Sequence, residues 1–312
     1  MGSRPTEQVT EQRVAERSTA GAFAVLVTIA GGNAVAVRYM VADDDVDPFW
    51  AASMRFLLAG LIFAGIALAL RTEWPRGRAL LGGVLYGALT GGGYAFAYWS
   101  LVRVPAGLGQ VILAFVPLLT FALALAHRQE RFRLEGLIGA ALAVSGIAII
   151  FGSGIDEGLP LTALIGIIVA AVCWAEASIV VKAFPPVHPV MMNAIGMMIA
   201  TAILLALAGV LGEASVLPEK ATAWIALAYL VTIGSVGVFA LYLFVLSRWS
   251  ASAASYEFVL IPLVTIGLSA WLLDEKITGA FTVGSVLVLI GVYFGALRGR
   301  SDEELIELGE EA

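Results

Sequence analysis

Long apolar runs separated by short polar segments fill almost the whole chain. Ten runs of about 20 residues stand out, at 20–40, 49–70, 79–101, 104–126, 134–151, 161–182, 189–211, 222–246, 251–273 and 278–297. A helix of about 20 apolar residues spans the hydrocarbon core of a bilayer. The runs are continuous, whereas a membrane barrel needs alternating strands of about ten residues. The pattern therefore predicts an all-α membrane protein with ten transmembrane helices.

The composition leads to the same class of protein. Hydrophobic residues make up 60% of the chain and charged residues 13%, against about 45–50% and about 25% in ordinary soluble domains. One water-soluble core cannot hide so much apolar surface, so we expect the lipid bilayer to surround it. The net charge is −6, and no basic stripe indicates a nucleic acid partner. Cys173 is the only cysteine, and we expect no disulfide, cofactor or metal.

The two ends of the chain are polar. Residues 1–19 mix both charges, and residues 299–312 form an acidic tail. The motif Ala34-Val35-Ala36 resembles a signal-peptidase site, which leaves a cleaved signal peptide as an alternative. Because apolar runs continue along the whole chain, we interpret the first run as an uncleaved membrane helix.

The distribution of Lys and Arg predicts the orientation. Cytoplasmic loops carry an excess of these residues. With a cytoplasmic N-terminus, thirteen of the 18 fall in inside segments: Arg4, Arg13, Arg17, Arg71, Arg76, Arg78, Arg128, Arg131, Arg133, Lys182, Arg248, Arg298 and Arg300. Four fall outside, namely Arg38, Arg103, Lys220 and Lys276. Both termini are therefore predicted to be cytoplasmic, in a bacterial-type inner membrane.

The chain matches itself at an offset of 145 residues. The matched positions include pairs of arginine, proline, glutamate and glycine: Arg103 with Arg248, Pro117 with Pro262, Glu130 with Glu275, and Gly146 with Gly291. This predicts a first repeat at 20–153 and a second at 154–298, each with five spans. Since five is odd, the second copy enters the membrane inverted. Inverted repeats are typical of secondary transporters, which bind substrate between the halves near the midplane.

These features resemble a known family. The first span contains "GGNAVAVR", the second "PFWAASMRFLLAG", and the fourth "PAGLGQVILAFVPLLTFALA" followed by Glu130. Together with the duplication, they resemble the drug/metabolite transporter superfamily, in its ten-helix EamA-type exporter branch. The resemblance implies ten helices around a central cavity. Ala30 stands where the family usually has Trp, while Trp174 occupies the matching place in the second half. The aromatic third span and Trp174 most resemble aromatic amino-acid exporters.

The segment "LTGGGYAFAYWS" (89–100) combines glycines with aromatic residues. Gly83, Gly87 and Gly91 are four residues apart and share one helix face, which Tyr94 and Tyr98 continue. Two interpretations remain open. The glycines allow close helix packing, or they line a cavity whose aromatic faces and Tyr hydroxyls bind an aromatic or cationic solute.

Three ionisable residues lie inside predicted spans, where they are functional candidates. Arg55 could hold a substrate carboxylate, or it could anchor structure by binding backbone carbonyls. Glu176 and Glu257 could each bind a substrate ammonium, carry a proton in a coupled cycle, or form ordinary hydrogen bonds. We expect no direct ion pair between Arg55 and either glutamate, because they lie at opposite depths.

Further candidates are polar, aromatic or helix-bending. Six of the seven Trp residues lie near predicted span ends, as membrane-interface Trp do. Trp174 lies well inside a span and is the strongest aromatic candidate. Four polar residues would either bind substrate or bond another helix: Asn33, Gln110, Ser178 and Tyr256. Four residues are candidate hinges, or alternatively static kinks and packing sites: Pro117, Pro262, Gly91 and Gly92.

The sequence thus predicts a secondary transporter that exports small organic solutes by alternating access. Aromatic and other neutral amino acids lead as substrates, ahead of other metabolites and hydrophobic drugs. An intramembrane enzyme is a remote alternative, because His127 and His188 fall in loops and no GxSxG or HExxH motif occurs. A channel is equally remote, because Arg55, Glu176 and Glu257 have no charged repeat mate. The motif of ATP-driven pumps is missing.

Overall fold

The computed structural model describes residues 5–40, 46–101, 103, 109, 112–151, 160–273 and 278–298, and these residues form helices joined by short loops. The main helices are α1 (Pro5–Met40), α2 (Pro48–Ala69), α3 (Arg78–Leu101), α5 (Val116–Ala126), α6 (Leu134–Phe151), α7 (Leu161–Ala183), α8 (Pro189–Leu211), α9 (Ala221–Val231), α10 (Val238–Leu246), α11 (Ala251–Ala254), α12 (Glu257–Leu273) and α13 (Gly279–Val292). Two π-helical segments, η3 (Thr232–Gly237) and η4 (Tyr293–Arg298), complete them. The predicted all-α fold is confirmed.

Within the described ranges, five helical stretches are long and apolar enough to cross a membrane. They are Pro48–Ala69, Arg78–Ser100, Leu161–Ala183, Pro189–Leu211 and Ala221–Leu246. Each agrees with a predicted span to within a few residues. Their apolar side chains lie both in the interior and on the outer surface, as a helix in lipid allows.

Three elements differ from the predicted spans. Helix α1 begins at Pro5 rather than near residue 20, because the polar segment after Pro5 contains no glycine or proline that would end a helix. In the fourth span, expected at 104–126, Ile112 and Leu113 are helical, a turn at Ala114 and Phe115 follows, and α5 begins at Val116. The ninth span breaks between α11 and α12, at the turn formed by Ser255 and Tyr256.

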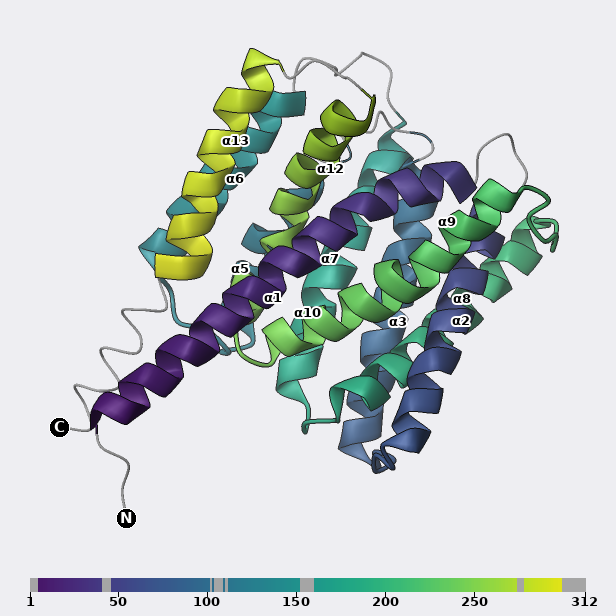
Figure 1. The fold of residues 1–312 in the computed structure, drawn as a ribbon, viewed down its shortest axis with the longest axis horizontal. Coiled ribbons are helices and arrows are strands. Elements are labelled where there is room, and N and C mark those ends of the chain that lie inside the picture. The colour runs from purple at the N-terminus through teal and green to yellow at the C-terminus, as the bar shows by residue number, and fades with distance from the viewer. Residues whose placement is uncertain are drawn as a thin grey trace.

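Helix neighbours occur in matching sets. The pairs α2–α8 and α6–α13 join elements that correspond in the two halves, while α1–α12 mirrors α5–α7 and α1–α10 mirrors α3–α7. A twofold relation between the halves produces such pairs. Figure 1 shows α1 across the front of the bundle beside α9 and α10, with α6 and α13 at one edge and α2, α3 and α8 at the other. The inverted orientation of the two halves in the bilayer stays a prediction.

Glycines permit the closest helix contacts. A Cβ atom added at Gly87 of α3 would lie 2.8 Å from the Cα of Gly196 in α8, and one added at Gly284 of α13 would lie 2.5 Å from the carbonyl oxygen of Gly146 in α6. Small residues let membrane helices approach this closely. Two helix pairs that join the halves, α3–α8 and α6–α13, therefore pack with their backbones in close contact.

Candidate functional site

A cavity of about 100 Å³ lies between the first half and the second. Helix α3 supplies one wall, and α7, α10 and α12 of the second half supply the others. The lining consists of Tyr86, Thr90, Tyr94, Trp174, Ala177, Val238, Phe239, Tyr242, Glu257 and Phe258. Pockets for drug-sized ligands usually measure about 300–1,000 Å³. The helices must therefore move apart before a larger solute fits.

Aromatic rings form most of the cavity wall. The rings of Tyr94 and Trp174 meet edge to face with centroids 5.2 Å apart, and Trp174 stacks on Phe258 at 5.3 Å. Phe239 lies 6.4 Å from Tyr94. Such rings present π faces and edges that bind apolar, aromatic and cationic groups. The wall suits a solute with an aromatic body.

Glu257 is the one charged residue among the described residues that line the cavity. It is the first residue of α12, directly after the turn at Ser255 and Tyr256. Its side chain is 8% exposed, and no ion pair joins it to another described residue. The positive end of the helix dipole lies at this end of α12 and favours a negative group there. The break in the ninth span thus places a carboxylate at the cavity.

A short hydrogen-bonded chain supports this wall. The hydroxyls of Ser178 and Tyr242 are 2.6 Å apart, and Ser178 Oγ also donates to the carbonyl oxygen of Trp174 at 3.1 Å. These bonds connect α7 to α10. Ser178 therefore contacts two lining residues without lining the cavity itself.

Arg55 lies elsewhere, in a polar junction of three helices. Its side chain is 3% exposed. Its Nε donates to Ser235 Oγ at 2.7 Å, and its Nη2 donates to the carbonyl oxygen of Gly234 at 2.7 Å. Asn33 Nδ2 of α1 donates to the same carbonyl at 3.1 Å. Both acceptors belong to η3, where π-helical turns leave backbone groups with altered partners. Arg55 and Asn33 thus make the structural hydrogen bonds that the sequence analysis gave as the alternative to substrate binding.

The remaining predicted residues that the structure describes do not line the cavity. Glu176 Oε1 lies 3.2 Å from His127 Nε2, and Glu176 is not among the lining residues. Tyr256 is buried with its hydroxyl against Gly295 of η4. Tyr98 packs in a neighbouring cluster, with its ring centroid 6.4 Å from that of Tyr94. Gln110 lies outside the described residues.

The candidate hinges occupy different surroundings. Pro117 lies in the first turn of α5, where its missing N–H costs no hydrogen bond, whereas its repeat mate Pro262 lies inside α12. A Cβ atom at Gly91 would lie 2.6 Å from the Cα of Ala200 in α8, while one at Gly92 would meet nothing within 4 Å. Gly91 thus serves close packing, and Gly92 faces open space.

Sequence reasoning named three of the lining residues: Tyr94, Trp174 and Glu257. The others show signals that are recognisable afterwards. Tyr86, Thr90 and Tyr94 are four residues apart and so share a helix face. Phe239 and Tyr242 are three apart on α10. Aromatic residues are common in apolar spans, so this spacing alone did not distinguish a cavity wall from ordinary packing.

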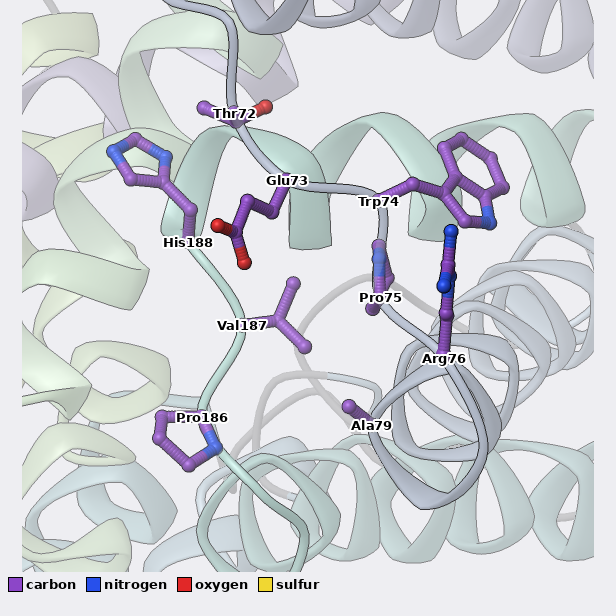
Figure 2. Close-up of a pocket in the computed structure, with 9 residues that line it drawn as sticks. All are labelled: Thr72, Glu73, Trp74, Pro75, Arg76, Ala79, Pro186, Val187 and His188. Carbon is purple, nitrogen blue, oxygen red and sulfur yellow. The ribbon is translucent and has the colours of Figure 1, made fainter.

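A second and larger hollow, of about 800 Å³, lies among loops. Figure 2 shows Glu73 and His188 on one side of it and the Trp74 ring beside Arg76 on the other. The α2–α3 loop and the segment between α7 and α8 form its walls. None of the predicted site residues contributes to it, and it lies at the ends of the helices. The inter-half cavity is therefore the better candidate for a substrate site.

Comparison with known proteins decides the family. The sequence profile of the EamA-like transporter family matches residues 18–152 and again residues 161–296. The chain belongs to the EamA-like transporter family. This confirms the resemblance found in the sequence, and with it that the chain is an integral membrane transporter built from two related copies.

Relatives of this EamA-like transporter have similar length. An uncharacterized inner membrane transporter, YedA, of Escherichia coli strain K12 is 28% identical over 284 residues, covering 88% of this chain and 91% of the relative. A probable amino-acid metabolite efflux pump of Salmonella typhimurium strain LT2 is 26% identical over 286 residues, covering 88% and 93%. A solved crystal structure shares the fold with a TM-score of 0.74 at 22% identity, over 92% of this chain and 99% of the other.

Proposed function

We propose that this EamA-like transporter is a secondary exporter of small organic solutes, with aromatic and other neutral amino acids as its main substrates. The observation that carries the proposal is the cavity between the halves, in which Tyr94, Trp174 and Phe258 surround space beside Glu257. The rings accept an aromatic side chain, and the carboxylate accepts an ammonium group. The name of the Salmonella relative, a probable amino-acid metabolite efflux pump, agrees with this class.

Contacts between the halves support alternating access. The loop between α5 and α6, from the first half, bonds to elements of the second half. Gln129 Nε2 donates to the carbonyl oxygen of Ile179 at 2.9 Å, and Glu130 accepts from both the backbone N–H and the hydroxyl of Ser252. These bonds lie at the end of the bundle that the charge bias predicts to be cytoplasmic. We propose that they close this end and break when the cavity opens towards the cytoplasm.

The proposal includes an orientation and a location. Both termini would be cytoplasmic, and the membrane would be the inner membrane, as in the name of the Escherichia coli relative. Substrates would enter from the cytoplasm and leave outside. Catalysis is not part of the proposed function. Transport would be driven by a gradient of protons or of another solute, or by the concentration gradient of the substrate alone.

A second candidate function is export of other metabolites or hydrophobic drugs. The aromatic wall favours it, because π faces bind many apolar solutes without further selection. If this candidate is correct, amino acids are neither taken up nor compete for uptake, whereas another solute is taken up.

Reconstitution tests the proposal. Purified protein in liposomes should take up labelled tryptophan and phenylalanine in a saturable manner, with a labelled polyamine as comparison and protein-free liposomes as blank. Saturable uptake of the two aromatic amino acids would support the lead substrate class. Silence for both amino acids, with clear uptake of another solute, would reject that class in favour of the second candidate.

A further inference from the structure

The charge of the cavity wall is one-sided. The ten described residues that line it include six aromatic side chains and one carboxylate, and none of these ten is Lys, Arg or His. The six aromatic residues are Tyr86, Tyr94, Trp174, Phe239, Tyr242 and Phe258. An amino acid brings both an ammonium and a carboxylate into this space. The wall offers a charged partner for only the first of these groups.

In its ionised form, Glu257 needs a positive partner. It is 8% exposed, and among the described residues no cation pairs with it. A buried charge without a partner is costly, so a group that supplies the opposite charge is bound favourably. An ammonium group of a solute satisfies this need directly.

Arg55, a buried arginine of α2, is hydrogen bonded to η3. Its Nε and Nη2 donate to Ser235 and Gly234 at 2.7 Å each, and it does not line the cavity. Its guanidinium carbon lies 5.4 Å from the centroid of the Phe56 ring, and Phe56 packs edge-on against Tyr94. A substrate carboxylate would therefore find no cation among the described lining residues, and Arg55 beside them already donates two hydrogen bonds to η3.

The aromatic rings add to the preference for a cation. Trp174 is stacked on Phe258, the residue that follows Glu257 in the chain, and it meets Tyr94 at its edge. Indole faces attract ammonium groups more strongly than the other aromatic rings do. A carboxylate has no such attraction to a π face, which carries partial negative charge.

We propose that the cavity recognises an aromatic ring together with an ammonium group and offers a carboxylate no cationic partner among the described lining residues. The proposal rests on the exporter function and narrows its substrate class. Aromatic amines and the amides of aromatic amino acids bind more tightly than the free amino acids. Aromatic carboxylates without an amine do not bind.

Four solutes that share one ring test this order. In liposomes containing the full-length protein, labelled tryptophan uptake is measured against increasing tryptophan, tryptophanamide, tryptamine and indole-3-propionate, with leak subtracted from protein-free liposomes. We expect tryptamine and tryptophanamide to half-inhibit at concentrations at least about tenfold below that of tryptophan. We expect no inhibition by indole-3-propionate. Inhibition by indole-3-propionate, or tryptophan inhibiting better than tryptamine, would overturn the proposal.

Variants of the carboxylate test its cause. Glu257→Gln keeps the shape and removes the charge, so the advantage of tryptamine over tryptophan should disappear, while Glu257→Asp should retain part of it. Glu135→Gln is the matched control at an exposed position in the first turn of α6, and it should leave the order unchanged. An unchanged advantage in folded Glu257→Gln would reject Glu257 as its source. If Glu257→Gln does not fold, the order of competitors in the unmodified protein still decides.

The outcomes separate the inference from the function. Tryptophan uptake without any preference for the amine or the amide would reject this inference and leave the exporter of amino acids intact. No uptake of labelled tryptophan or labelled tryptamine would reject both.

Discussion

Gly93 offers the sharpest test of the cavity wall, because one added methyl group acts on Trp174. A Cβ atom at Gly93 would lie 2.5 Å from Trp174 Nε1 and 2.7 Å from its Cδ1. Ordinary contacts begin at 3.4 Å, so the indole ring would have to retreat by about 0.9 Å. Phe258 is stacked on the indole at 5.3 Å and limits that retreat. Gly93→Ala therefore displaces the indole ring that lines the cavity of about 100 Å³.

The expected magnitude follows from the cost of overpacking. Extra methyl groups in a packed interior cost about 1–3 kcal/mol, and alanine regains about 1 kcal/mol through its better helix propensity. The net cost to stability should therefore be about 0–2 kcal/mol. If the strain acts on the state that binds substrate, 1–3 kcal/mol corresponds to a loss of about 5- to 150-fold in transport.

The assay compares two glycine substitutions. Initial uptake of the transported solute is measured in liposomes for Gly93→Ala and for Gly65→Ala, whose added Cβ would meet nothing within 4 Å. Unfolding temperatures in detergent serve as the stability control. We expect Gly93→Ala to lose at least about fivefold in uptake and Gly65→Ala to retain it. Wild-type uptake by a folded Gly93→Ala protein would refute the assignment of Trp174 to the site.

Three further changes extend these tests. Trp174→Ala should lower uptake without lowering the amount of protein in the membrane, and unchanged uptake would make Trp174 a packing residue. Arg55→Gln should destabilise the protein by about 3 kcal/mol or more, because it removes two charge-assisted hydrogen bonds to η3 worth about 1.5–3 kcal/mol each; an unfolding midpoint equal to that of the unmodified protein would contradict this. Gly92→Ala introduces no clash, so a fall in uptake at constant stability would identify a backbone hinge, as the sequence predicts, and constant uptake would argue against it.

The sequence was sufficient to predict where most helices lie, but not how each helix is rotated about its own axis. Continuous apolar runs determine where helices cross the bilayer, which is why the bounds of α2, α3, α7 and α8 agree with prediction. Glu176 and Glu257 are equally deep by sequence, yet only Glu257 lines the cavity. Which face of a helix meets the cavity depends on packing between distant segments, and no local pattern encodes it.

Local departures from regular helix were also beyond sequence reasoning. The π-helical turns at η3 place the carbonyl of Gly234 where Arg55 and Asn33 both donate to it. Since the sequence does not reveal these turns, Arg55 could be interpreted equally well as a substrate ligand or as a structural anchor. Trp174 was recognisable because tryptophan in mid-span departs from the interfacial pattern, whereas Phe239 and Phe258 look like ordinary apolar residues.

The opposed orientation of the two copies is measured most directly by labelling Arg103 and its repeat mate Arg248. Each is replaced by cysteine in a Cys173→Ala background that still transports, and intact cells are treated with a membrane-impermeant maleimide. The account predicts labelling of Arg103→Cys on intact cells, and labelling of Arg248→Cys only after permeabilisation. Labelling of both positions from the same side would contradict it.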